Sequence, residues 1–403
     1  MSDLDIDDQI KDLANLLQEM KQKAAEDINN NFNYESEFTE IKNYTSQIYD
    51  IVKNMPPEQI ESYQKEQDNP PSLPPVNNKE IKSLKILHRQ EKIFGDAPIR
   101  AMCLLSDNRI AFGSLRGEIA IYQIDLIKQT AQEIMKPFNA HSDIIQSLST
   151  TNNGDLISGS DDFKVKLWSI GKNNIFIKPG FSVNTNCHED SITKVLGLKN
   201  GLIASSSNVQ KEEQPSLILW NTKRELQSEY KDSKFSAFSM TEVKNKNRVL
   251  AVLSFGNNKK LCLFDSNNFT TPLATIKTLE CTNRNALFAL PNSHVAILRD
   301  QDMCIVEVNS SSINEKKIIK HEEINSNSTE VAFEMHPDEE SFVFTVDKHL
   351  IQIESKGNFK ILNCHKLENE FGGEGVFFMK RDDKLYLVAD NKQRGFTLFA
   401  VNH

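Results

Sequence analysis

One pattern of residues occurs twice in the middle of the sequence, and it limits the possible folds more than any other feature. The stretch that begins at His141 reads HSDIIQSLSTTNNGDLISGS, and the stretch that begins 47 residues later at His188 reads HEDSITKVLGLKNGLIASSS. Each stretch continues into a strand that ends in a tryptophan, Trp168 in the first and Trp220 in the second. Each therefore predicts an apolar strand, a turn, a second apolar strand, another turn and an alternating strand.

Five weaker copies of this pattern lie before and after these two. One begins APIRAMCLL and has Tyr122 at the position of the tryptophan, and the other four start near residues 234, 283, 328 and 373. The spacing stays within about 43 to 48 residues, which is the range of propellers built from four-stranded blades. The seven copies therefore predict an all-β protein with a seven-bladed β-propeller.

The last copy is short by one strand. It ends with GFTLFAVNH, which completes only a third strand, and an additional apolar stretch, SLKILHRQEKI at residues 83–93, precedes the first copy. A ring that left these two segments unpaired would have exposed sheet edges. We therefore expect residues 83–93 to pair with residues 395–402 and to complete the last blade, so that the propeller spans residues 81–403.

The segment LISGSDDFKVKLWSI resembles the WD40 repeat, and the resemblance extends over residues 81–403. It implies that a histidine, a serine, an aspartate and a tryptophan form one hydrogen-bonded chain within a blade. The residues at these positions are His141, Ser158, Asp162 and Trp168 in the second copy, and His188 and Trp220 in the third. A buried indole N–H needs an acceptor, so we interpret this set as structural rather than as a catalytic triad. In the third copy the insertion NVQKEEQP displaces the turn aspartate, and we expect a looser blade there.

The sequence carries no signature of catalysis or of cofactor binding. It contains no phosphate-binding loop, dinucleotide fingerprint, nucleophile elbow or HExxH motif, and its six cysteines form no CxxC pair. An enzymatic propeller needs carboxylates or histidines on its innermost strands, and the segments expected there contain only Glu334 and His336. We therefore expect no enzyme activity, no catalytic residues, no metal ion and no cofactor.

Residues 1–57 have a different apolar pattern. The two core positions of a seven-residue repeat hold Ile10, Leu17, Ala24, Phe38 and Val52, and Leu13, Met20, Tyr34, Ile41, Ile48 and Met55. This pattern predicts an N-terminal α-helical coiled coil, and Asp27, Asn31 and Thr45 interrupt it. One continuous helix and a hairpin broken at INNNFN both fit. Residues 58–80 are rich in proline and polar residues, which is typical of a linker.

Charge and hydropathy limit the compartment and the partners. The formal net charge of −9 does not favour a nucleic acid or an anionic membrane as partner. The first residues, MSDLDIDDQI, lack the apolar core of a signal peptide, and no apolar run approaches the roughly 18 residues of a membrane span. We therefore expect a cytoplasmic protein that does not bind membranes.

A coiled coil followed by a propeller is typical of interaction scaffolds. We expect a scaffold or adaptor whose propeller binds a protein or peptide and whose residues 1–57 form a homodimer or join a helix of another protein. Two alternatives are a structural subunit of a cytoskeletal or ciliary assembly and a substrate adaptor of a ubiquitin ligase. The inserted loop and the neighbouring turns open on one rim, where we expect partner binding by Arg116, Asp161, Lys211 and Glu212.

Overall fold

The computed structural model describes residues 80–171, 175–177, 188–209, 214–223, 225–232, 235–256, 258–277, 281, 285–325, 331–346, 348–366 and 371–403. The predicted coiled coil of residues 1–57 lies outside the described residues, and so does all of the predicted linker except residue 80. Lys211 and Glu212, two of the four residues predicted to bind a partner, also lie outside them.

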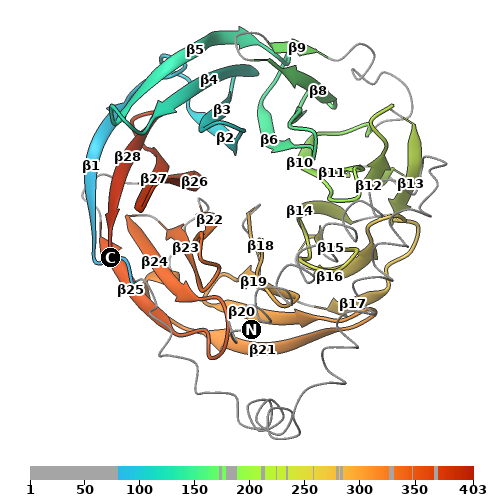
Figure 1. The fold of residues 1–403 in the computed structure, drawn as a ribbon. Coiled ribbons are helices and arrows are strands. Elements are labelled where there is room, and N and C mark those ends of the chain that lie inside the picture. Colours follow the sequence, from blue (N-terminus) through green and yellow to red (C-terminus); the bar gives the residue numbers. More distant parts are fainter. Residues whose placement is uncertain are drawn as a thin grey trace, which may run out of the picture. The chain divides into compact units, whose positions relative to one another are not determined.

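Seven antiparallel sheets of four strands each are arranged around a common centre (Figure 1). In chain order the strands are β1 (Ser83–Gln90), β2 (Ile99–Leu104), β3 (Arg109–Ser114), β4 (Glu118–Asp125), β5 (Thr130–Asn139), β6 (Ile145–Thr150), β7 (Leu156–Ser160), β8 (Val165–Ile170), β9 (Ile175–Ile177), β10 (Ile192–Gly197), β11 (Ile203–Ser207), β12 (Pro215–Trp220), β13 (Leu226–Lys231), β14 (Ser236–Glu242), β15 (Arg248–Phe255), β16 (Asn258–Asp265), β17 (Ala274–Lys277), β18 (Leu287–Ala289), β19 (His294–Leu298), β20 (Met303–Val308), β21 (Ile313–Ile319), β22 (Val331–Met335), β23 (Ser341–Val346), β24 (His349–Glu354), β25 (Ile361–Lys366), β26 (Phe371–Arg381), β27 (Lys384–Asn391) and β28 (Gly395–Asn402). A short 3-10 helix, η1 (Glu322–Asn325), lies between β21 and β22. Among the described residues there is no helix with the length and apolar character that crossing a membrane would require.

Each sheet corresponds to one copy of the sequence repeat, which confirms the predicted seven-bladed propeller. The first strand of each copy is the innermost strand of its blade, and these strands are β2, β6, β10, β14, β18, β22 and β26 (Figure 1). Each blade has four antiparallel strands, so its outermost strand ends on the face where its innermost strand began. The chain then enters the next blade from that face, and the seven innermost strands therefore begin on the same face of the ring. We call this face the upper face; the turns between second and third strands, such as β7–β8, open on it as well.

The ring closes through the strand that precedes the first copy, as predicted. Strand β1 pairs antiparallel with β28, from Ser83 opposite Asn402 to Gln90 opposite Phe396. The sheet order β1-β28-β27-β26 makes β1 the outermost strand of the last blade. The two ends of the propeller therefore share one sheet, and β1 covers the edge of β28 that would otherwise be exposed.

Strand β1 is shorter than the predicted segment 83–93, because the chain turns after Gln90. The N–H groups of Lys92 and Ile93 donate to the carbonyls of Gln393 and Arg394, at 3.2 and 3.1 Å, and so follow the turn before β28. Gly395 lies at this junction, and a Cβ there would collide with the carbonyl oxygen of the neighbouring strand. Closure thus requires glycine at this position.

The core lies between neighbouring blades, where the faces of adjacent sheets meet. The rings of Phe112 and Tyr122 in the first blade pack on Phe396 of the last blade, with centroid separations of 5.2 and 5.6 Å. All three side chains are buried. Full burial of each such ring stabilises the fold by about 2–3 kcal/mol before the cost of ordering is subtracted. Packing between blades therefore holds the ring together and fixes the positions of the strand ends at its centre.

Candidate functional site

The second blade contains a chain of hydrogen bonds that runs from its tryptophan to its turn aspartate. Trp168 Nε1 donates to the Ser158 hydroxyl at 2.8 Å, and this hydroxyl lies 2.7 Å from His141 Nε2. His141 Nδ1 lies 2.9 Å from the carboxylate of Asp162. Because the indole can only donate, Ser158 accepts from it and donates to Nε2, which leaves the Nδ1 proton for the carboxylate.

The protonation states of this chain follow from burial and from its partners. Burial lowers the pKa of His141, and the nearby Asp162 carboxylate opposes this only in part, so the ring is neutral at pH 7. Burial raises the pKa of Asp162, but the hydrogen bond and charge of His141 and two backbone N–H donors outweigh it and leave the pKa lowered. Ser158 has no exposed surface. A substrate therefore has no access to the serine, in contrast to the nucleophile of a hydrolase.

The third blade has the same arrangement with one substitution. Trp220 Nε1 donates to the Ser205 hydroxyl at 2.9 Å, and His188 Nε2 lies 2.8 Å from that hydroxyl. In place of an aspartate, the carbonyl of Pro215 accepts from His188 Nδ1 at 3.0 Å. Burial lowers the pKa of His188 to about 4. The insertion thus removes the turn aspartate from this blade, and a main-chain carbonyl takes over its contact.

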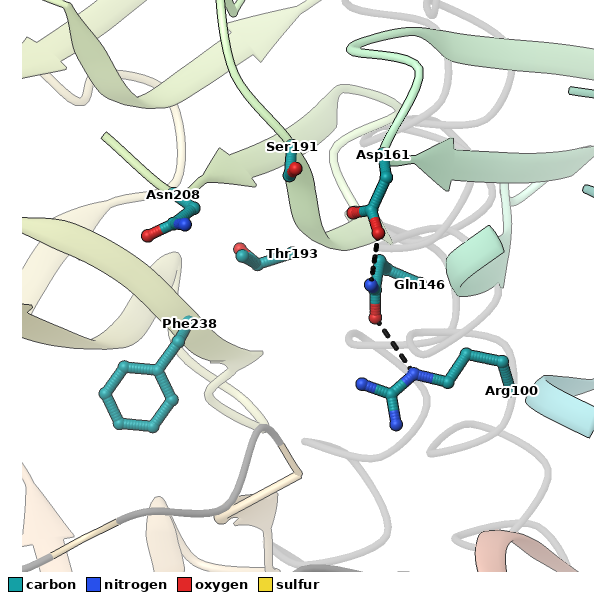
Figure 2. A pocket seen from close by; sticks show the side chains of 7 residues that line it. All are labelled: Arg100, Gln146, Asp161, Ser191, Thr193, Asn208 and Phe238. Carbon is teal, nitrogen blue, oxygen red and sulfur yellow. Dashed lines mark hydrogen bonds between the residues drawn. The ribbon is translucent and has the colours of Figure 1, made fainter. Parts of the chain in front are cut away.

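A pocket of about 310 Å³ opens beside the centre of the ring on the upper face (Figure 2). Four of its lining residues come from successive innermost strands: Arg100 on β2, Gln146 on β6, Thr193 on β10 and Phe238 on β14. The other three lie in connections that reach the same face: Asp161 after β7, Ser191 before β10 and Asn208 after β11. The pocket is therefore a product of four blades, each of which contributes the start of its first strand or a neighbouring turn.

Polar contacts fix one wall of the pocket. Arg100 Nε donates to Gln146 Oε1 at 3.0 Å, and Gln146 Nε2 donates to Asp161 Oδ2 at 2.8 Å (Figure 2). A guanidinium has no acceptor, so the amide oxygen must face Arg100 and the amide nitrogen must face Asp161. Arg100 also lies 3.7 Å from the carboxylate of Glu374, whose side chain is 7% exposed.

The predicted rim overlaps this pocket in part. Asp161 lines it, and so does Asn208, the first residue of the inserted loop. Arg116 is exposed in the turn between β3 and β4 but does not line the pocket. The contribution of Lys211 and Glu212 remains a prediction, since both lie outside the described residues.

The other pocket residues were not predicted from the sequence: Arg100, Gln146, Ser191, Thr193 and Phe238. A signal was nevertheless present for the four that lie on strands. Each stands at the second or third position of an innermost strand, where the other side chains are mostly apolar. In all four strands the polar or aromatic side chain at this position lines the pocket.

The innermost strands carry more acidic side chains than the sequence predicted. Innermost strands also carry Glu242 and Glu374, because β14 and β26 extend beyond the expected segments. They also carry Lys194, whose Nζ donates to Asn285 Oδ1 at 2.9 Å. Burial raises the pKa of Glu334 to about 8, although the charge of Lys244 opposes this. Within the described part of the chain, no three histidine, cysteine or acidic side chains are placed to hold a metal ion.

Comparisons with known proteins agree on the fold. No protein-family model matches the sequence, and no curated protein matches it. The β-propeller domain of Cps50 (Swd1) from Myceliophteria thermophila is similar at 12% identity and a TM-score of 0.57, over 79% of this chain and 100% of that one. The WD40 β-propeller domain of Doa1 is similar at 12% identity and a TM-score of 0.54, over 79% of this chain and 96% of that one. At this level of identity the likeness establishes the β-propeller fold and not a function.

Proposed function

We propose that this protein is a non-catalytic interaction scaffold whose propeller binds a protein partner at the upper-face pocket. The pocket carries the proposal, because it combines a hollow of about 310 Å³ with several polar groups that converge on it. Ligand sites in proteins are typically concave and contain a few placed polar groups. A hollow of this size suits one or two side chains of a partner, and the surrounding turns supply further contact area.

Hydrogen bonds fix the turn that carries Asp161, and a fixed turn favours the binding of a partner. The Asp161 N–H donates to the carbonyl of Ile144 at 2.9 Å, and the Ser160 hydroxyl donates to the carbonyl of Asp143 at 3.0 Å. The next residue, Asp162, ends the hydrogen-bonded chain of the second blade. A side chain on such a turn loses little conformational entropy when a partner binds, and this favours affinity.

The placement of the acidic, basic and hydroxyl groups favours binding over catalysis. The only serine–histidine–aspartate chain found among the described residues is buried beneath a tryptophan. The acid with the strongly raised pKa, Glu334, is not among the residues that line the pocket. A general acid or base must lie within hydrogen-bonding reach of its substrate, so these groups are poorly placed to act on a molecule in the pocket.

We further propose that residues 1–57 link the propeller to a second copy or to a partner helix. The seven-residue apolar pattern of that segment supports this part of the proposal. Two linked propellers would bind a partner that carries two copies of the recognised segment more tightly than either alone, because the second contact becomes intramolecular.

A pair of matched substitutions in the full chain tests the pocket. Ser191→Tyr places a large ring in the hollow, and Ser311→Tyr places the same ring on an exposed turn between β20 and β21, away from the upper face. Tagged versions of both variants and of the wild type are purified with their partners, which are quantified by mass spectrometry. We expect Ser191→Tyr to lose partners that Ser311→Tyr retains. Equal partner sets, with unchanged melting temperatures, would place the binding surface elsewhere.

A further inference from the structure

The upper-face pocket presents the carboxylate of Asp161. Asp161 Oδ2 accepts a hydrogen bond from Gln146, and no lysine or arginine in the described part of the chain forms an ion pair with this carboxylate. A carboxylate can accept about four hydrogen bonds, so Asp161 has capacity left for a ligand. The turn holds it at the mouth of the hollow, where Figure 2 shows its carboxylate between Ser191 and Gln146.

The neighbouring arginine does not neutralise Asp161. Gln146 stands between the two groups and takes the Arg100 Nε–H on its carbonyl oxygen, at 3.0 Å. The positive charge of Arg100 is matched instead by Glu374, at 3.7 Å. The pocket therefore contains one balanced ion pair and one carboxylate whose side-chain partner is a neutral amide.

The other side chains around the pocket can also interact favourably with a cation. Ser191 and Asn208 present a hydroxyl and a carboxamide, both of which can accept hydrogen bonds from an ammonium or a guanidinium. The ring of Phe238 forms the wall opposite Asp161 (Figure 2). A cation over an aromatic face gains about 0.5–1 kcal/mol at exposed sites. An anion would instead meet the carboxylate of Asp161, and an apolar group would bury that carboxylate without a partner.

We propose that this pocket binds the positively charged side chain of a lysine or arginine in the partner protein, with Asp161 as its counter-charge. This inference rests on the proposed function, and it specifies which part of a partner the pocket takes. The cation lies against Phe238, donates one hydrogen bond to Asp161, and donates others to Ser191 and Asn208. Arg100 and Glu374 act as positioning residues, because they orient Gln146 and thereby the carboxylate.

A random dodecapeptide library displayed on phage, selected against the full chain, tests this proposal. Selected peptides are synthesised, and their affinities are measured by fluorescence polarisation for the wild type and for Asp161→Asn. The asparagine keeps the shape and the hydrogen bond from Gln146 but removes the charge. Asp382→Asn is the matched control, because Asp382 is 87% exposed in the β26–β27 turn on the face opposite the pocket.

We expect the selected peptides to share a lysine or arginine. Changing that residue to glutamine, or changing Asp161 to asparagine, should weaken binding roughly tenfold, which is about 1.4 kcal/mol. The two changes together should cost little more than either alone, because they remove the same contact. Asp382→Asn should leave affinity unchanged.

Two results would overturn the inference in distinguishable ways. Peptides that lose binding in Ser191→Tyr but have no common basic residue, or that tolerate Asp161→Asn, would leave the pocket as a protein-binding site and refute its preference for a cation. Failure to select any peptide that Ser191→Tyr weakens would count against both the cation and the proposed function.

Discussion

Replacing Ser158 by alanine tests whether the hydrogen-bonded chain of the second blade supports the turn that carries Asp161. The Ser158 hydroxyl joins Trp168 Nε1 to His141 Nε2, at 2.8 and 2.7 Å, and all three side chains are buried. Alanine leaves the indole N–H and the imidazole nitrogen without partners in a place that water does not reach. Each orphaned buried group costs about 1–3 kcal/mol, so for two such groups we expect a loss of roughly 2–6 kcal/mol in the free energy of unfolding.

Urea unfolding followed by far-ultraviolet circular dichroism measures this loss, since a midpoint shift at constant slope reports stability. Ser239→Ala is the matched control, because Ser239 is also buried and its hydroxyl makes no hydrogen bond within the described part of the chain. A second measurement uses Trp168→Phe, which removes the indole N–H and keeps an aromatic ring. In that background Ser158→Ala orphans only the imidazole, so its cost should fall by about 1–2 kcal/mol. A cost no larger than that of Ser239→Ala, or an additive double-mutant cycle, would refute the reasoning.

Three further outcomes are expected. Trp168→Ala removes a whole buried ring and should cost about 3–5 kcal/mol in the same urea assay, and a loss below about 1 kcal/mol would contradict its assignment to the core. Light scattering should give a dimer for the full chain and a monomer after deletion of residues 1–57, and a monomeric full chain would rule out self-association. The raised pKa of Glu334, about 8 because of burial, favours its neutral form in the folded state. Its contribution to stability is therefore complete below the unfolded pKa near 4.5 and is lost as pH rises towards 8. Glu334→Gln should flatten this decline and be more stable than the wild type by roughly 1–2 kcal/mol at pH 8, and an unchanged slope between pH 5 and 8 would contradict it.

The pocket and the hydrogen-bonded chain depend on each other through neighbouring residues of one turn. Asp162 ends the chain inside the blade, while Asp161 turns its carboxylate to the pocket. A change at Ser158 that loosens the turn should therefore weaken ligand binding as well as stability. If Asp161 binds a ligand as proposed, the hydrogen-bonded chain of the second blade would then support recognition as well as stability.

The part of the fold that could be predicted well is the part encoded by local patterns. Alternation of apolar residues depends only on neighbours along the chain, so the seven copies and their order could be recognised from the sequence alone. The unpaired segment before the first copy identified the closing strand, although its end at Gln90 rather than Ile93 depends on the turn before β28. His141, Ser158, Asp162 and Trp168 could be assigned because their segment resembles the WD40 repeat, and the resemblance implies a hydrogen-bonded chain at these positions.

The third blade contains a contact that the sequence pattern did not predict. The sequence indicated that the insertion removes the turn aspartate, but it did not indicate what replaces it. The replacement is the main-chain carbonyl of Pro215. Any residue has such a carbonyl, so no side-chain pattern marks it, and only the path of the chain after the insertion brings it to His188.

The repeat, the number of blades, the closing strand and the hydrogen-bonded chain all follow from the order of the amino acids. The position of the pocket and the charge that it presents follow instead from the tertiary structure. Its walls come from residues as far apart as Arg100 and Phe238, on four different sheets. Their distances depend on how blades pack around a closed ring, which is a cooperative property of the whole domain. The lack of a lysine or arginine partner for Asp161 among the described residues has the same origin, because Arg100 contacts Gln146 and Glu374 only when the first, second and last blades meet at the centre.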